Sequence, residues 1–156
     1  MKKLLLLTLS SLAVVACGGS TLTIHRYLSD PRYSGDGIYI TVAYLNESSS
    51  TGSEKMISMA FTIKNNSEKK QNYVFENYKC YRESTNYGYE VGSTTLMFSN
   101  TITLEPELSS SVSFIATIPT SVTTEKYTFK SKINNFMFEL HLYNSDGSLD
   151  SRYWNF

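Results

Sequence analysis

Net charge, long apolar runs and internal repeats are all missing from this chain of 156 residues. Lys and Arg together number 14, as do Asp and Glu, so no net field draws the protein to nucleic acid. No apolar run reaches the ~20 residues that a membrane-spanning helix needs. No heptad, no repeat of 20 to 50 residues and no proline-rich linker occurs, which predicts a single domain.

Local catalytic and metal-binding motifs are missing as well. The sequence has no HExxH, phosphate-binding loop, nucleophile elbow or CxxC. Its two histidines, His25 and His141, have no partner at a metal-ligand spacing, so we expect neither a metal site nor a cofactor, and no enzyme. A catalytic triad assembled from distant residues would escape such a search, which keeps a small hydrolase open as an alternative.

The first residues have the layout of a secretory signal peptide. Lys2 and Lys3 precede an apolar segment, residues 4–15, that is too short to span a bilayer. The stretch that follows, Val14-Val15-Ala16-Cys17, resembles the lipobox of bacterial lipoproteins. This resemblance implies cleavage after Ala16, a diacylglycerol on the Cys17 thiol and usually a further acyl chain on the new amino terminus. An ordinary secretory cleavage site at the same place is the alternative.

A lipid anchor at Cys17 would hold the protein at the membrane of the bacterial cell envelope. Stable anchoring takes at least two acyl chains, since one holds only marginally. The domains predicted are a signal peptide at 1–16, the lipidated cysteine with a short tether at 17–22, and one folded domain at 23–156. Five tether residues reach at most ~17 Å, so the domain should lie close to the bilayer. No Asp follows Cys17, which favours the outer membrane and leaves the periplasmic or surface side open.

The body of the chain alternates apolar and polar residues with the period of half-buried strands. Twelve Tyr and eight Phe suit such strands. "MISMAFTIKN" and "NFMFELHLYN" show the pattern most plainly, and stretches rich in Asn, Ser and Gly separate the strands. We therefore predict an all-β fold, an antiparallel sandwich of about seven to nine strands, with a closed barrel as the rival. The expected core includes Ile57, Phe61, Phe114, Phe138 and Leu140.

The order of segments from Ile57 to Pro119 resembles the Ig-like domains of bacterial lipoproteins of unknown function. A strand ends in Asn65-Asn66-Ser67, a later segment reads Leu-Glu-Pro, and a Ser-rich strand closes on Ile-Pro. The resemblance implies an Ig-like sandwich and a place in the envelope, and it supplies no catalytic residues. One departure is Glu107, which follows Pro106 where that family usually has Gly, so the turn is expected to differ.

Cys80 and the segment 144–150 each allow a chemical and a plain interpretation. With Cys17 lipidated, Cys80 has no disulfide partner, and its place in "VFENYKCY" predicts a small buried side chain. Asn144, Asp146, Ser148 and Asp150 have the oxygen spacing that begins a calcium loop. However, Gly147 stands fourth instead of sixth, so we expect a hairpin turn and no metal.

Tyrosines in loop-like sequence are the candidates for binding, because Tyr supplies rigid contact area at low entropic cost. We expect Tyr33, Tyr87 and Tyr89, with Arg82 as a charged companion, to contact a protein or glycan ligand. These tyrosines would otherwise cover the core at strand ends. The function predicted is a lipid-anchored, non-catalytic binding module. A structural or accessory subunit of an envelope complex is the alternative, ahead of the small hydrolase.

Overall fold

The computed structural model describes residues 21–49, 53–82, 89–90, 93–119 and 126–154. Strands and turns make up these residues, and no helix occurs among them. The strands are β1 (Leu22–Tyr27), β2 (Tyr33–Gly35), β3 (Ile38–Ser49), β4 (Glu54–Asn65), β5 (Gln71–Arg82), β6 (Tyr89–Glu90), β7 (Thr94–Leu96), β8 (Thr101–Leu104), β9 (Ser109–Pro119), β10 (Tyr127–Ile133) and β11 (Phe136–His141).

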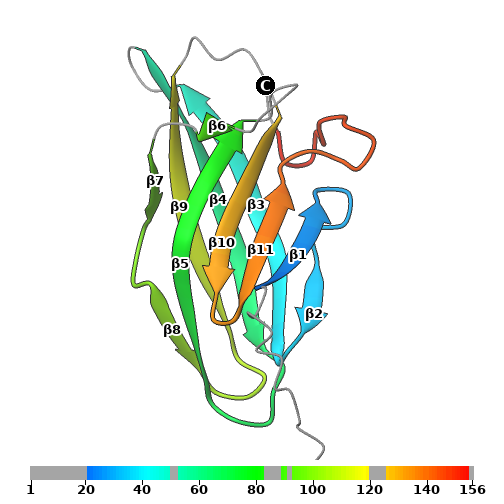
Figure 1. The fold of residues 1–156 in the computed structure, drawn as a ribbon, viewed down its shortest axis with the longest axis vertical. Helices are drawn as coiled ribbons and strands as arrows, with labels where there is room; N and C mark the ends of the chain where they lie inside the picture. The colour runs from blue at the N-terminus through cyan, green and yellow to red at the C-terminus, as the bar shows by residue number, and fades with distance from the viewer. Residues whose placement is uncertain (1–20, 50–52, 83–88, 91–92, 120–125, 155–156) are drawn as a thin grey trace, which may run out of the picture.

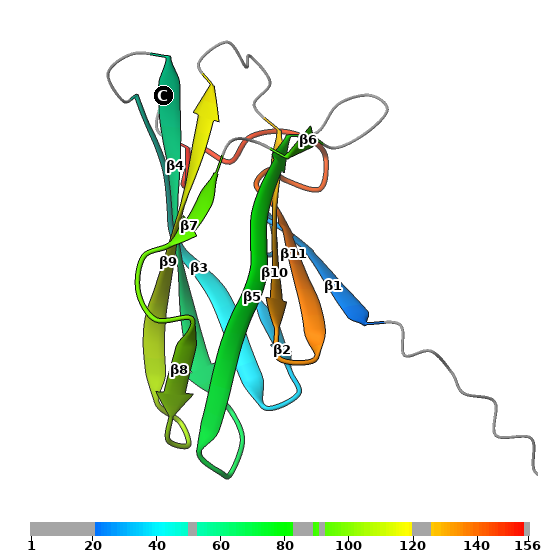
Figure 2. The same ribbon diagram turned by 60° about the vertical axis from the view of Figure 1, so that its left-hand side comes forward.

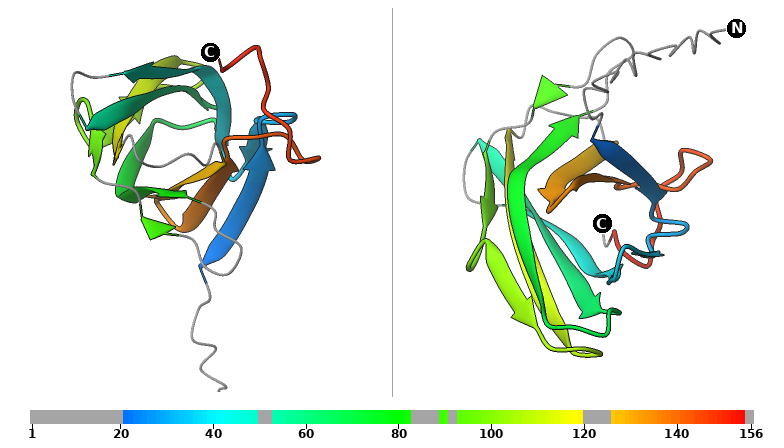
Figure 3. Two further views of the ribbon diagram at one scale, coloured as in Figure 1. Left: turned by 90° about the horizontal axis from the view of Figure 1, so that it is seen from above. Right: turned by 60° about the horizontal axis from the view of Figure 1, so that its bottom comes forward.

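Two sheets face each other (Figures 1 and 2). One has the order β1-β11-β10-β5-β6, with β8 also paired to β5, and the other has the order β2-β3-β4-β9-β7. Seen along the long axis, the sheets enclose the core between them (Figure 3). The predicted all-β sandwich is confirmed. The described chain has more strands than the seven to nine expected. Four of them, β2, β6, β7 and β8, are only two to four residues long, and strands this short show no alternation in the sequence.

The pairing of β1 with β11 is parallel, whereas the other paired strands among the described residues are antiparallel. The sandwich predicted from the sequence is antiparallel throughout, and the β1–β11 pair differs from that prediction. The difference arises because β1 does not continue into a hairpin within its own sheet: after a turn in which Asp30 N donates to Tyr27 O, the chain enters β2 in the opposite sheet. The first strand of the described chain thus forms the edge of a sheet beside the last strand.

The core forms from the inward-facing residues of both sheets. The five residues expected there are all buried, and they belong to one hydrophobic cluster. Four phenylalanines form its centre: the ring of Phe114 lies 4.7 Å from that of Phe129, and Phe61 contacts Phe114, Phe129 and Phe138. Ring pairs at such distances add to the stabilisation from apolar burial. The alternation seen in the sequence therefore identified the inward faces of β4, β9 and β11.

A bulge in β5 changes which residues of that strand face inward. Tyr73 and Phe75 are buried before the bulge and Cys80 after it, while the register with β10 shifts between Lys130 and Lys132. Asn77 at the bulge has φ 49°, in the left-handed region that Asn tolerates better than most residues. Because an extra residue reverses the inward face, simple alternation does not hold along the whole of β5: Val74 and Cys80 are six residues apart, yet only Cys80 is buried.

The Asn-x-Ser segment after β4 ties three loops together. The Asn65 side chain is buried, and its Nδ2 donates to the backbone oxygens of Lys69 and Leu104 at 2.8 and 2.9 Å. Its Oδ1 accepts hydrogen bonds from Ser67 and from the Tyr73 hydroxyl. A buried polar side chain is tolerated when its donors and acceptors are paired in this way. Asn65 thereby fixes the end of the sandwich at which β4 turns into β5.

The Leu-Glu-Pro segment turns sharply at Glu107. This residue has φ 64°, the left-handed conformation that a Gly adopts at little cost. The turn is closed by Leu108 N, which donates to Glu105 O, and by Glu107 N, which donates to Asn65 O. The chain therefore forms a turn with positive φ at Glu107, a conformation that costs Glu more than it would cost Gly.

Candidate functional site

The outward face of the first sheet brings both histidines together. On β1, His25 and Tyr27 are two residues apart and share that face, and Glu139 and His141 do the same on β11. The parallel register sets His25 beside Glu139 and Tyr27 beside His141. Strand β10 extends both rows, with Lys130 beside Glu139 and Thr128 beside His141. Six polar or aromatic residues thus form two neighbouring rows across three strands.

Glu139 is the centre of this group. Its Oε1 lies 3.3 Å from His25 Nδ1 and 3.5 Å from His141 Nε2, while its Oε2 lies 2.8 Å from Lys130 Nζ. One donor atom from each of His25, Glu139 and His141 lies within 4.8 Å of the other two. Imidazole nitrogen and carboxylate oxygen are the atoms by which proteins hold zinc and copper. We call His25, Glu139 and His141 the histidine–carboxylate cluster.

The surroundings of Glu139 favour its charged form. Burial acts to raise the pKa of this carboxyl, but the hydrogen bond and the charge of Lys130, followed by the attraction of His25 and His141, outweigh it. The pKa of Glu139 therefore lies below its ordinary value. The side chain is 11% exposed, so the sheet presents a carboxylate that is largely shielded from water. A negative charge in such a place requires positive partners.

The two histidines differ in their environments. His141 is held firmly: Tyr27 stacks on its ring at 4.4 Å, and its Nδ1 lies 3.0 Å from the Tyr143 hydroxyl and 3.1 Å from Thr128 Oγ1. Its side chain is 13% exposed, whereas that of His25 is 58% exposed. One imidazole is therefore fixed in place by packing, and the other stands at the open edge of the sheet.

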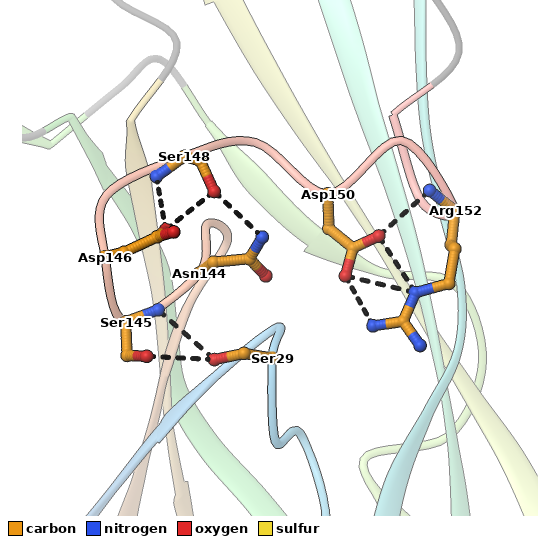
Figure 4. A network of polar contacts seen from close by, with 7 residues as sticks. All are labelled: Ser29, Asn144, Ser145, Asp146, Ser148, Asp150 and Arg152. Atoms are coloured by element: carbon orange, nitrogen blue, oxygen red, sulfur yellow. Dashed lines mark hydrogen bonds and ion pairs between the residues drawn. The ribbon is translucent and has the colours of Figure 1, made fainter.

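A shallow depression of about 170 Å³ adjoins the cluster. Strand β1 and the turn after it form most of the depression, and Ser145 from the segment after β11 completes it. Its lining comprises His25, Arg26, Tyr27, Ser29, Asp30 and Ser145. The two segments are joined by hydrogen bonds between Ser29 Oγ and both Ser145 N and Ser145 Oγ, which Figure 4 shows. The accessible side of His25 thus opens onto a concave surface.

The predicted hairpin turn at 144–147 is present as a turn, and no strand follows it in the described chain. Gly147, with φ 83°, donates to Asn144 O, and Asn144 N donates to Ser148 O. The oxygens of a calcium loop would have to converge. Figure 4 shows instead that Asp146 receives hydrogen bonds from Ser148, while Asp150 is turned to Arg152. The arrangement supports the turn interpretation.

Among the residues proposed for binding from the sequence, Tyr33 lies on β2, far from Arg82 on β5 and Tyr89 on β6. Tyr33 is half-buried and packs against the core, with its ring 5.7 Å from Phe136 and its hydroxyl bonded to Asp36. Arg82 is also half-buried, and it pairs with Tyr89 where β5 meets β6. Figures 1 and 2 place β2 and β6 at different ends of the sandwich. Tyr87, like the predicted lipidation site Cys17, lies outside the described residues.

The thiol of Cys80 lies in the core, as predicted. Cys80 is fully buried, and burial raises its pKa to about 12. Reactive cysteines need a lowered pKa and access to solvent. Cys80 has neither property, and its thiol fits the place of a small buried side chain.

The histidine–carboxylate cluster escaped the sequence analysis because its members come from opposite ends of the described chain. Spacing rules find ligands that are neighbours in sequence, and they cannot show that β1 pairs with β11. The available signal was weaker. Each strand carries two polar or aromatic residues at i and i+2, which marks one outward face, but the register between the strands is a tertiary property.

The comparisons with known proteins give only distant structural likenesses. No protein-family model matches the chain, and no curated protein matches it. Among solved structures, it is similar to an uncharacterised β-sandwich protein from Clostridium difficile 630, with a TM-score of 0.47, 11% identity and coverage of 80% of this chain and 99% of that chain. A FixG-related protein from Vibrio parahaemolyticus has a TM-score of 0.44 and 14% identity, with coverage of 69% of this chain and 94% of that chain. The apo PCuAC domain from PmoF1 has a TM-score of 0.42 and 10% identity, with coverage of 76% of this chain and 98% of that chain.

The TM-scores of all three structures are below 0.5, so the class of protein is stated from the fold of this chain alone: its two facing sheets define a β-sandwich domain. In the part of the chain that the structure describes, no helix is both long and apolar enough to cross a membrane.

Proposed function

We propose that this protein is a lipid-anchored binding module of the bacterial cell envelope and that its ligand site is the histidine–carboxylate cluster. The observation that carries the site is the convergence of His25 and His141 on one Glu139 oxygen, at 3.3 and 3.5 Å. Support for the anchor comes from the lipobox-like Val14–Cys17 segment. Strand β1 begins at Leu22, so few residues separate Cys17 from the sheet.

The way in which the cluster is held suits a binding site. Its three side chains project from paired strands, and positions on strands are fixed more rigidly than positions on loops. The accessible His25 and the depression beside it offer a surface to a ligand. The fully buried thiol of Cys80 adds no nucleophile to this surface. A β-sandwich with such a face is suited to hold a ligand, and hydrolysis of generic ester and peptide substrates is expected to be absent.

The anchor is tested by replacing Cys17 with Ala. We expect the wild type to partition into the detergent phase of Triton X-114 and the variant to remain unprocessed. Mass spectrometry of the wild type should give an acylated Cys17 at the amino terminus. Recovery of the wild type in the aqueous phase with a free Cys17 amino group would refute the anchor.

The site is tested by comparing two substitutions on β1. His25→Ala removes a member of the cluster, and Thr23→Ala changes an exposed residue two positions earlier on the same face. Binding to envelope extracts should be lost in the first variant and kept in the second, with equal Tm values. Equal binding by both variants would contradict the proposed site. A constant stoichiometric partner that both variants retain would indicate the alternative, a structural subunit.

A further inference from the structure

We propose that the histidine–carboxylate cluster binds one divalent transition-metal ion of the zinc and copper class, through His25 Nδ1, Glu139 Oε1 and His141 Nε2. This inference rests on the proposed function, because it names the ligand of the site proposed there. The reasons lie in the spacing of the three donor atoms, in the groups behind them and in the opening toward solvent.

The donor spacing matches a tetrahedral metal. Two ligand atoms that are each 2.0 to 2.1 Å from Zn²⁺ lie about 3.3 Å apart at a tetrahedral angle. The distances from Glu139 Oε1 to His25 Nδ1 and to His141 Nε2 are 3.3 and 3.5 Å. Each of the three side chains also offers one donor atom within 4.8 Å of a donor atom of the other two. The exposed side chain of His25 can rotate to bring the two imidazole nitrogens closer together, while His141 stays in its packed position.

The groups behind the ligands resemble the supporting contacts of known metal sites. Metal-bound imidazoles usually donate the hydrogen of their other nitrogen to an oxygen, which fixes the ring and leaves the remaining nitrogen for the ion. The hydroxyls of Tyr143 and Thr128, at 3.0 and 3.1 Å, stand at Nδ1 of His141 and can accept such a bond. Lys130 holds the second oxygen of Glu139 at 2.8 Å, which directs Oε1 toward the histidines. Each fixed ligand therefore has an orienting partner.

The positive charge of Lys130 disfavours a bound cation, because its ammonium group and the ion would both lie at the Glu139 carboxylate. Its side chain is 36% exposed, so the ammonium can move outward and remain hydrated when an ion enters. The carboxylate then balances part of the charge of the ion in a setting where water screens it little. The ordinary alternative is an ion pair of Glu139 with Lys130 and no metal ion.

The donor set also selects the class of ion. Mg²⁺ and Ca²⁺ prefer six or more oxygen ligands, whereas imidazole nitrogens suit zinc and copper. Three protein donors leave at least one coordination position to solvent, since structural zinc sites close with four. His25, the most exposed of the three ligands, also lines the depression of about 170 Å³, which offers a fourth ligand a route to the ion. The bound ion would be accessible from outside the protein.

The test titrates untagged, EDTA-stripped, full-length protein in detergent with ZnCl₂ and CuCl₂ by calorimetry, with MgCl₂ and CaCl₂ as comparisons. We expect one Zn²⁺ or Cu²⁺ per chain and no binding of the hard ions. His25→Ala and Glu139→Gln should each weaken binding by more than ~100-fold, because removing even an outer partner costs 10 to 100-fold. Tyr143→Phe should weaken it by ~10-fold, and Thr23→Ala should leave it unchanged.

Spectroscopy of the copper complex counts the imidazole nitrogens bound to the ion, and this count would not change if His25 served only the stability of the fold. The electron paramagnetic resonance spectrum should show two imidazole nitrogens in the wild type and one in His25→Ala, at equal Tm values. Absence of binding would overturn the inference in favour of the ion pair, and equal affinity in all variants would overturn it in favour of adventitious sites. If metal binding fails while His25→Ala still abolishes ligand capture, only the identity of the ligand is refuted and the binding module stands.

Discussion

Replacing Phe61 by Ala tests whether the four-phenylalanine centre holds the two sheets together. Phe61 lies on β4, whose neighbours are β3 and β9, and is 3% exposed. Its ring contacts Phe114, Phe129 and Phe138 at 5.8, 5.3 and 6.3 Å. Returning such a side chain to water costs about 1.5 to 3 kcal/mol. A residual cavity of roughly 80 Å³ adds about 2 kcal/mol, at ~24 cal/mol per Å³.

The free energy of unfolding should therefore fall by ~3 to 5 kcal/mol, measured by urea denaturation followed by circular dichroism. A domain of ordinary stability has only about 5 to 15 kcal/mol, so the variant would be close to unfolding. Phe98→Ala is the matched control, because Phe98 is 77% exposed and its loss should change stability by less than ~0.5 kcal/mol. A loss below ~1 kcal/mol for Phe61→Ala would refute the packing argument.

Three further predictions concern a turn, a thiol and an ion pair. The Glu107→Gly variant should be about 1 kcal/mol more stable to urea than the Glu107→Ala variant. Both variants lose the ion pair with Lys64, but only Gly adopts φ 64° freely, so equal stabilities would contradict this prediction. The Cys80 thiol, with its pKa raised to about 12, should resist iodoacetamide in the native protein and react in 6 M guanidinium, as judged by mass spectrometry against Cys80→Ala; rapid native alkylation would disprove the burial. The hydrogen bond from Arg152 lowers the pKa of Asp150, so this pair stabilises the fold above the ordinary Asp pKa of ~3.9 and its contribution is lost as the pH falls through the lower, folded value. The Tm difference between the wild type and Asp150→Asn should accordingly shrink below pH ~4, and a difference that grows there would reverse the assigned sign.

The fold could be predicted from the sequence wherever local pattern decides it. Alternation in β4, β9 and β11 placed Phe61, Phe114 and Phe138 in the core, since a half-buried strand must turn every second residue inward. It failed in β5, where the bulge at Asn77 inserts a residue and reverses the inward face. The parallel edge pair was beyond reach because no local signal specifies which distant strand becomes a neighbour.

The candidate site could be predicted only in part. The alternation in "NFMFELHLYN" that turns Phe138 and Leu140 inward leaves Glu139 and His141 on the opposite face of β11, where they pair with His25 and Tyr27 of β1. The pairing with His25 could not be predicted, because the position of His25 depends on the register of β1 against β11. The sequence left two roles open for the tyrosines, contact with a ligand or covering of the core. At Tyr33 the structure shows the ring packed on Phe136. Loop-like sequence around an aromatic residue does not reveal whether its ring faces inward.

The parallel pairing of the first and last strands has a consequence for the order of folding. Leu22 pairs with Phe136, so closing this contact means closing a loop that contains almost all of the described chain. Loop-closure entropy makes such contacts late and slow, whereas the β10–β11 hairpin can form early. His25 reaches the Glu139 carboxylate only when β1 pairs with β11. A chain emerging in stages, amino terminus first, would therefore carry His25 exposed and unpaired until its last strand was available, and completion of the site would coincide with completion of the fold.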